Sequence, residues 1–154
     1  MPVTRLNHAV LYVRDAERVA AFYQDVLGFE VVTQFPGAVF LKAAGTDNHH
    51  DLGLFSIGEG APLPERGRVG LYHLAWQVST IEDLVALAEK LRDVGALVGS
   101  SDHEVSKSLY AKDPDGNEFE VMFEVPREAW TPGLEAGAPI GALDLDKELA
   151  RWGS

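Results

Sequence analysis

The chain has 154 residues, of which 46% are hydrophobic and 24% charged, and these proportions are typical of one folded globular domain. Its 24 acidic and 13 basic residues give a net charge of −11, so we expect no binding to nucleic acid or to an anionic membrane surface. The absence of cysteine excludes disulfides, thiolate metal ligands and thiol catalysis. Because the sequence shows neither an apolar run of about 18 residues nor a charged-then-apolar leader, we expect a cytoplasmic protein.

An internal repeat divides the chain into two similar halves. Residues 6–13 (LNHAVLYV) and residues 71–78 (LYHLAWQV) are both apolar and β-prone, and both have histidine in the third place. A helix signal follows each segment. Asp15 is a suitable N-cap in the first half, and Thr80 with Asp83 resembles a capping box in the second. Each half therefore begins with a strand that leads into a helix.

Three further strands are predicted after each helix, and the helices are expected to end at Gly28 and Gly95. The predicted strands are residues 29–33, 38–43 and 51–57 in the first half and residues 96–99, 107–112 and 117–124 in the second. The sequence thus predicts an α+β fold in which each half has the order β-α-β-β-β, and neither half alone looks able to bury both faces of its sheet. We expect a single domain, residues 1–154, made of module one (5–57), a linker (58–70), module two (71–124) and a C-terminal tail (125–154).

The linker and the tail leave two questions open. Because residues 58–70 are long enough for either arrangement, the modules pair within one chain or are exchanged between two chains. The tail ends in a predicted helix, residues 144–152, whose Leu145, Leu149 and Trp152 are expected to dock on the body. A surface wrap and an oligomer contact both fit this tail, and a homodimer is the expected assembly.

Three side chains that can ligate a metal are predicted on one face of the strands. Alternation along each strand places His8, His73 and Glu120 opposite the uniformly apolar faces that should carry the helices. Two imidazoles and one carboxylate form the donor set of a facial triad, which leaves positions open for substrate and oxygen. A single histidine in a strand is more often a hydrogen-bonded structural residue. The equivalent placement of two histidines in a repeat is the more specific signal.

This pattern resembles the vicinal oxygen chelate superfamily over residues 5–124. The resemblance implies two β-α-β-β-β modules paired into a cup around a divalent metal, with ligands in the first strand of each module and in the last strand of a module. Carried over, these ligands are His8, His73 and Glu120, so the resemblance implies a metal-binding cup. The turn Asp113-Pro114-Asp115-Gly116-Asn117, typical of the family, would set Glu120 in register because Pro and Gly favour a tight turn.

Within that superfamily, the sequence is most similar to extradiol ring-cleaving dioxygenases. Their signature has a histidine, then an apolar residue and a tyrosine, then a Pro-x-Gly turn and the metal-binding glutamate. This chain has His103, Leu109-Tyr110, Pro114-Asp115-Gly116 and Glu120 in that order. His50, which lies just before a predicted strand, matches the acid–base histidine of these enzymes. The resemblance therefore implies His50, Tyr110 and His103 as catalytic residues.

The implied reaction uses Fe(II), with Mn(II) as the second choice, and takes O2 and a small catechol-like aromatic as substrates. His50 would take a proton from a catechol hydroxyl, and the Tyr110 hydroxyl would hydrogen-bond an intermediate. The ring would open beside the diol to give a semialdehyde. The chain departs from the family pattern in several features, one of which is a longer gap from His50 to His73. Ser101 stands where the signature has Gly, Asn, Thr or an aliphatic residue, and the better-known enzymes have four modules instead of two.

Other functions stay open at the level of the sequence. One alternative is a non-oxidative member of the superfamily, either a glyoxalase-type isomerase or epimerase or a thiol transferase that acts on an antibiotic. A glyoxalase-type site commonly has a fourth ligand, a glutamate in the last strand of module one, where this chain has His50 and Asp51. Another alternative is a non-catalytic drug-binding protein of the bleomycin-resistance kind. The intact set of predicted metal ligands weighs against that alternative.

Overall fold

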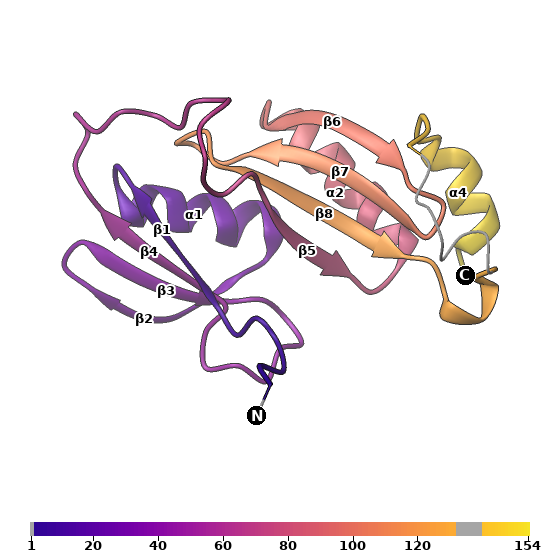
Figure 1. The fold of residues 1–154 in the computed structure, drawn as a ribbon, viewed down its shortest axis with the longest axis horizontal. Helices are drawn as coiled ribbons and strands as arrows, with labels where there is room; N and C mark the ends of the chain where they lie inside the picture. Colours follow the sequence, from indigo (N-terminus) through magenta and orange to yellow (C-terminus); the bar gives the residue numbers. More distant parts are fainter. Residues whose placement is uncertain (1, 132–139) are drawn as a thin grey trace. The chain divides into compact units, whose positions relative to one another are not determined.

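The structure, a computed structural model, describes residues 2–131 and 140–154 (Figure 1). Its elements are β1 (Ala9–Val13), α1 (Ala16–Leu27), β2 (Glu30–Phe35), β3 (Ala38–Lys42), β4 (Leu52–Ser56), β5 (Leu74–Val78), α2 (Ile81–Asp93), β6 (Leu97–Asp102), β7 (Ser106–Lys112), β8 (Glu118–Glu124), the 3-10 helix η1 (Arg127–Ala129) and α4 (Leu145–Trp152). The order strand, helix and three strands occurs twice. This order confirms the predicted α+β fold class of two β-α-β-β-β modules.

The chain divides into two compact units. The first comprises Met1–Arg66 with Asp113–Gly116, and the second comprises Gly67–Lys112 with Asn117–Ser154. The short turn between β7 and β8 therefore belongs to the first unit, although both of its strands belong to the second. The pairing of the modules as a metal-binding cup stays a prediction, and so do the module boundaries.

The two sheets share one topology. Their strand orders are β1-β4-β3-β2 and β5-β8-β7-β6, and in each sheet the first strand of the module pairs in parallel with the last. The other neighbours are antiparallel. A register shift recurs as well, between Val31 and Thr33 in the first sheet and between Leu97 and Gly99 in the second. Because β5 and β8 are neighbours, the start of β5 lies beside the first half of β8.

Both long helices begin and end where the sequence predicts. The Asp15 carboxylate accepts hydrogen bonds from the backbone N–H groups at the start of α1, and Thr80 Oγ1 accepts one from Asp83 N–H at the start of α2. Gly28 ends α1 with a φ of 72°, a left-handed conformation that favours glycine. Gly95 follows α2 with a φ of 69°. These local signals explain why the two helices could be placed from sequence.

The helices cover one face of each sheet, and this decides which side chains remain on the other face. In the second unit, α2 packs against β8, whose buried side chains are Phe119, Val121 and Phe123. Because side chains alternate along a strand, Glu120 lies on the opposite face of β8, where the burial is only partial. In β1, Leu11 and Val13 are buried while Val10 and Tyr12 are exposed. The predicted alternation is therefore confirmed in both strands.

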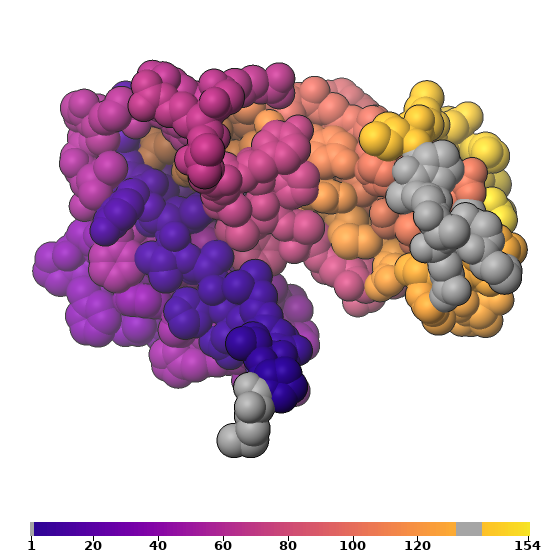
Figure 2. All heavy atoms as spheres, in the orientation of Figure 1, coloured from indigo at the N-terminus to yellow at the C-terminus, as the bar shows by residue number. Residues whose placement is uncertain are grey.

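The described part of the tail confirms the predicted C-terminal helix. Helix α4 begins after Asp144, which accepts a hydrogen bond from Lys147 N–H, and packs on α2. It forms the yellow end of the chain in Figures 1 and 2. The apolar residues expected to dock are only half-buried, whereas Glu148 is 1% exposed. Residues 132–139 of the predicted tail lie outside the described residues. Within the described ranges, no helix is long and apolar enough to cross a membrane.

Candidate active site

The second unit brings three predicted site residues together. His73 immediately precedes β5, and its Nε2 lies 3.2 Å from Glu120 Oε2 on β8. Tyr110 of β7 is directly opposite Glu120 in the antiparallel register, so the two side chains share a face of the sheet. The ring centroids of His73 and Tyr110 are 5.8 Å apart. A histidine–glutamate pair, predicted to ligate a metal, and a phenol hydroxyl thus lie together, with Glu120 on the face of β8 opposite α2.

A triangle of hydrogen-bonding atoms adjoins this cluster. Tyr110 Oη lies 3.0 Å from His103 Nε2, and Ser101 Oγ lies 2.7 Å from the same nitrogen and 3.1 Å from Tyr110 Oη. Ser101 is 6% exposed, so water competes little for these bonds. The imidazole and the phenol are therefore held against each other by a third group, which restricts both side chains.

Sequence reasoning noted Ser101 only as a departure from the family signature and assigned it no role. The predicted strand ends at residue 99, whereas β6 continues through Asp102 because its backbone pairs with β7, with Ser101 opposite Ser108. Ladder hydrogen bonds override the weak β-propensity of this polar stretch. Alternation along the longer strand was the signal that could have placed Ser101 beside Tyr110.

The first unit brings the other two predicted histidines together. Ala9 of β1 pairs with Leu52 of β4, so the residues that precede the two strands lie at one end of the sheet. The ring centroids of His8 and His50 are 4.5 Å apart, and Phe40 presents an edge-on contact to His50 at 5.1 Å. Sequence reasoning missed Phe40, whose position becomes evident only from the pairing of β3 with β4.

The surroundings of His50 keep its imidazole neutral. Desolvation by partial burial lowers the pKa of His50, and the neighbouring His8 and His49 lower it further, while Asp51 acts in the opposite direction. The net effect is a pKa below the ordinary value of 6.5. A neutral imidazole at neutral pH can accept a proton, as a general base requires.

Hydrogen bonds fix the loop that carries His50. The Asp51 carboxylate is 9% exposed and accepts hydrogen bonds from Ala43 N–H, the Thr46 hydroxyl and the Asn48 amide. Asn48 Oδ1 in turn accepts hydrogen bonds from Arg5 and Asn7, next to His8. The loop is therefore tied both to the residue that follows β3 and to the N-terminal segment.

The residues of the second unit fit a divalent metal, although only two of the three predicted ligands lie in that unit. In an octahedral site with bonds of about 2.1 Å, neighbouring donor atoms are about 3.0 Å apart, close to the separation of 3.2 Å between His73 Nε2 and Glu120 Oε2. His73 Nδ1 is buried and lacks a hydrogen-bond partner among the described residues. His8 belongs to the other unit. No group of three or more His, Asp or Glu side chains that could hold a metal is formed within the described ranges, so the complete triad stays a prediction.

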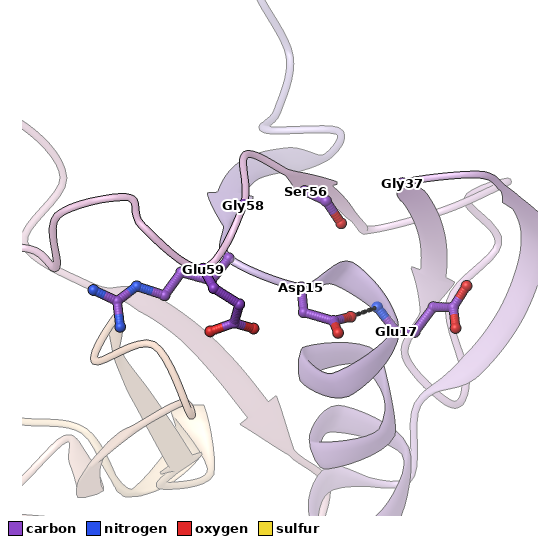
Figure 3. Close-up of a pocket in the computed structure, with 7 residues that line it drawn as sticks. Asp15, Glu17, Gly37, Ser56, Gly58 and Glu59 are labelled. Atoms are coloured by element: carbon purple, nitrogen blue, oxygen red, sulfur yellow. Dashed lines mark hydrogen bonds between the residues drawn. The ribbon is translucent and has the colours of Figure 1, made fainter.

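A pocket in the first unit is separate from these residues. It is lined by Asp15, Glu17, Gly37, Ser56 and Glu59, among others, at the start of α1 (Figure 3). None of the predicted site residues lines it. The Asp15 carboxylate is already occupied by the N–H groups of α1, so this pocket is not a candidate for the chemistry.

Comparison with known proteins assigns the family. Residues 5–121 match the Glyoxalase/Bleomycin resistance protein/Dioxygenase superfamily. The chain is 35% identical over 145 residues to a catechol-2,3-dioxygenase of Bacillus subtilis, covering 94% of this chain and 50% of that protein. It is 39% identical over 136 residues to a biphenyl-2,3-diol 1,2-dioxygenase 3 of Rhodococcus globerulus, covering 84% and 70%. This chain therefore spans half of the Bacillus relative.

The family also contains other activities. An ethylmalonyl-CoA/methylmalonyl-CoA epimerase of Cereibacter sphaeroides is 30% identical over 112 residues, which cover 67% of this chain and 81% of that protein. A glyoxylase/bleomycin resistance protein/dioxygenase domain from Frankia sp. EAN1pec has the same fold, with a TM-score of 0.66 and 23% identity over 82% of this chain and 96% of that one. The chain belongs to the glyoxalase/bleomycin resistance protein/dioxygenase superfamily.

Proposed function

We propose that the protein is a metal-dependent extradiol-type dioxygenase that cleaves the ring of a small catechol-like aromatic with O2. The observation that carries the proposal is the cluster in the second unit. Its imidazole–carboxylate pair, His73 and Glu120, adjoins a tyrosine that is hydrogen-bonded to His103. Relatives named as dioxygenases of catechol and of biphenyl-2,3-diol support the same substrate class.

His8, His73 and Glu120 would hold the metal, for which we propose Fe(II), with Mn(II) as the alternative. When bound, the metal would supply a Lewis acid for the two hydroxyl groups of the diol and electrons for the reaction with O2. Two neutral imidazoles and one carboxylate leave a divalent ion with one positive charge. That charge favours a substrate that has lost a proton.

The residues of the chain would manage the protons. His50, as a neutral imidazole, would accept a proton from a substrate hydroxyl. Tyr110 and His103 would donate a hydrogen bond to the oxygen atoms of the reacting group, and Ser101 would hold the pair in place. In the overall reaction the ring bond beside the diol breaks, and both atoms of O2 enter the semialdehyde product.

The test is oxygen uptake by the reconstituted protein. The protein is loaded with Fe(II) without oxygen and then assayed with an oxygen electrode on a panel of catechols. We expect stoichiometric consumption of O2 and catechol. A protein that binds the metal but takes up no oxygen with any catechol would contradict the proposal and favour a non-oxidative activity.

His50→Phe separates proton transfer from metal binding. Phenylalanine keeps a ring against Phe40 but removes the base, so turnover should fall about 10²- to 10⁴-fold while the metal content stays at the wild-type level. Steady-state oxygen uptake and elemental analysis measure the two quantities. Loss of the metal in this variant would show that His50 is a ligand and not a base.

An epimerase or isomerase is the second candidate, and the similarity to the Cereibacter sphaeroides epimerase favours it. It would act without consuming oxygen. Asp51 is a poor substitute for a fourth metal ligand, because its carboxylate is buried and occupied by three donors from its own loop. A drug-binding protein would need no metal, so a metal content that His73→Ala abolishes would argue against that function.

A further inference from the structure

A buried cluster of charges joins the C-terminal helix to the hairpin formed by β6 and β7. Lys107 of β7 and Glu148 of α4 each have side chains only 2% exposed, and Lys107 Nζ lies 3.4 Å from Glu148 Oε2. The same ammonium group is 2.5 Å from Asp102 Oδ1 at the end of β6. Trp152 Nε1–H donates a hydrogen bond to Glu148 Oε2, so the carboxylate is held from its own helix as well.

Asp102 connects this cluster to the loop that carries His103. Its carboxylate accepts a hydrogen bond from Glu104 N–H, across a turn in which Glu104 has a φ of 62°. A residue other than glycine adopts this left-handed conformation only where its surroundings hold it. His103 stands between these two residues, and its N–H donates to Ser106 O. The Asp102 carboxylate therefore bonds to the turn that contains His103.

The C-terminal segment also binds Asp102 through backbone hydrogen bonds from Gly141. Asp102 N–H donates to Gly141 O at 3.0 Å, and Gly141 N–H donates to Asp102 O at 2.8 Å. Burial opposes ionisation of Asp102, but the hydrogen bonds from Lys107 and from Glu104 N–H outweigh it and lower the pKa. Asp102 is thus ionised at neutral pH and is bound by Lys107, by Glu104 N–H and by the backbone of Gly141.

We propose that the C-terminal segment Gly141–Trp152 positions His103 through the chain of contacts from Glu148 to Lys107 to Asp102. The inference rests on the proposed function, since it takes His103 as a residue of the active site. A buried ion pair is on average no more stabilising than apolar side chains of the same volume, so stability alone does not account for this one. The ion pair instead contacts Asp102, whose carboxylate bonds to the loop that contains His103.

The experiment compares variants inside the cluster with a matched variant outside it. Glu148→Gln removes one charge and keeps the shape. Lys107→Met with Glu148→Met replaces the buried pair by apolar side chains, and Asp102, whose side chain is 19% exposed, keeps the hydrogen bond from Glu104 N–H, so the protein should stay folded. The control is Glu82→Gln, because Glu82 accepts hydrogen bonds from Ser154 and thus also ties the tail to α2, but does not touch Asp102.

Two readouts are measured. In the metal-free protein, the NMR resonance of the His103 ring, assigned by its loss in His103→Asn, should move in the two cluster variants and stay in place in Glu82→Gln. With metal and catechol, kcat should fall about tenfold or more in the double variant while KM changes less than about twofold, because misplacing a reacting group mainly affects the chemical step.

The two readouts test the positioning role and the proposed function separately. An unmoved His103 resonance with unchanged kcat in a folded double variant would overturn the positioning role, and so would loss of folding in both cluster variants, since stability would then explain the cluster. Oxygen uptake by the wild type together with an unmoved resonance would contradict this inference alone. A wild type without oxygen uptake, but with a resonance that moves, would contradict the proposed function and keep the positioning role.

Discussion

Ser101 places one hydroxyl within hydrogen-bond distance of both His103 and Tyr110. Without such a support, a tyrosine and a histidine would each sample several side-chain conformations. Holding them in one conformation before the reaction lowers the entropic part of the activation barrier. At the scale of the residue, Ser101, by which this chain departs from the family signature, is therefore a third hydrogen-bonding group beside His103 and Tyr110.

Ser101→Ala should lower kcat about tenfold, because it removes hydrogen bonding worth about 1.4 kcal/mol from the reacting geometry. The metal content should not change, since Ser101 is outside the proposed ligand set. Steady-state kinetics and elemental analysis check both. The matched control is Ser108→Ala, because Ser108 is fully buried but its Oγ has no hydrogen-bond partner among the described residues. Equal kcat values for both variants would contradict the role of Ser101.

At the scale of the element, the turn between β7 and β8 matters most. Asp115 is 4% exposed, and its carboxylate accepts hydrogen bonds from Arg14 N–H at 2.6 Å and from Arg18 Nη2 at 2.5 Å. Gly116 has a φ of 82°, which suits glycine and closes the turn. Because the turn joins the strands that carry Tyr110 and Glu120, it fixes the register in which these two residues face each other.

Asp115→Ala should lower the free energy of unfolding by about 1–3 kcal/mol, mainly because the Arg14 N–H loses its acceptor. The Arg18 contact contributes less, since that side chain is 42% exposed and water screens it. Urea denaturation measures the change. Asp25→Ala, at an exposed position of α1, is the control and should leave the stability nearly unchanged. A wild-type midpoint for Asp115→Ala would mean that the turn needs no support from α1.

At the scale of the whole molecule, the two units divide the proposed site between them. One unit holds His73, Glu120, Tyr110 and His103, and the other holds His8 and His50. Neither unit alone contains the full proposed ligand set, so the proposed metal binding would need residues of both. The proposed homodimer would meet the same requirement whether the modules pair within a chain or between chains.

Metal binding should therefore stabilise the folded protein, and His73→Ala should abolish this effect. A ligand present at about 100 times its dissociation constant adds about 2.7 kcal/mol to the stability. Thermal midpoints with and without Fe(II) under anaerobic conditions measure it, and His49→Ala, in an exposed loop position, is the control. An equal rise in midpoint for wild type and His73→Ala would contradict the ligand assignment.

The sequence by itself determined the fold class, the two helices and the faces of the strands. These features depend on local signals. Caps such as Asp15 and Gly28 act on neighbouring backbone groups, and alternation decides which side of β8 carries Glu120. Because the chain contains a repeat, each local signal occurs in both halves, and the structure predicted for one half strengthens the prediction for the other.

Only the tertiary structure decided how distant residues meet. The contact of Ser101 with Tyr110 and the burial of Glu148 against Lys107 both depend on register and on side-chain packing between separate segments. From sequence alone a polar residue is predicted to be exposed, because burying it costs free energy unless a partner binds it, and the sequence does not show the partner. The fold supplies the partner, and this is why the C-terminal helix was expected to dock through its apolar residues but buries the carboxylate of Glu148 instead.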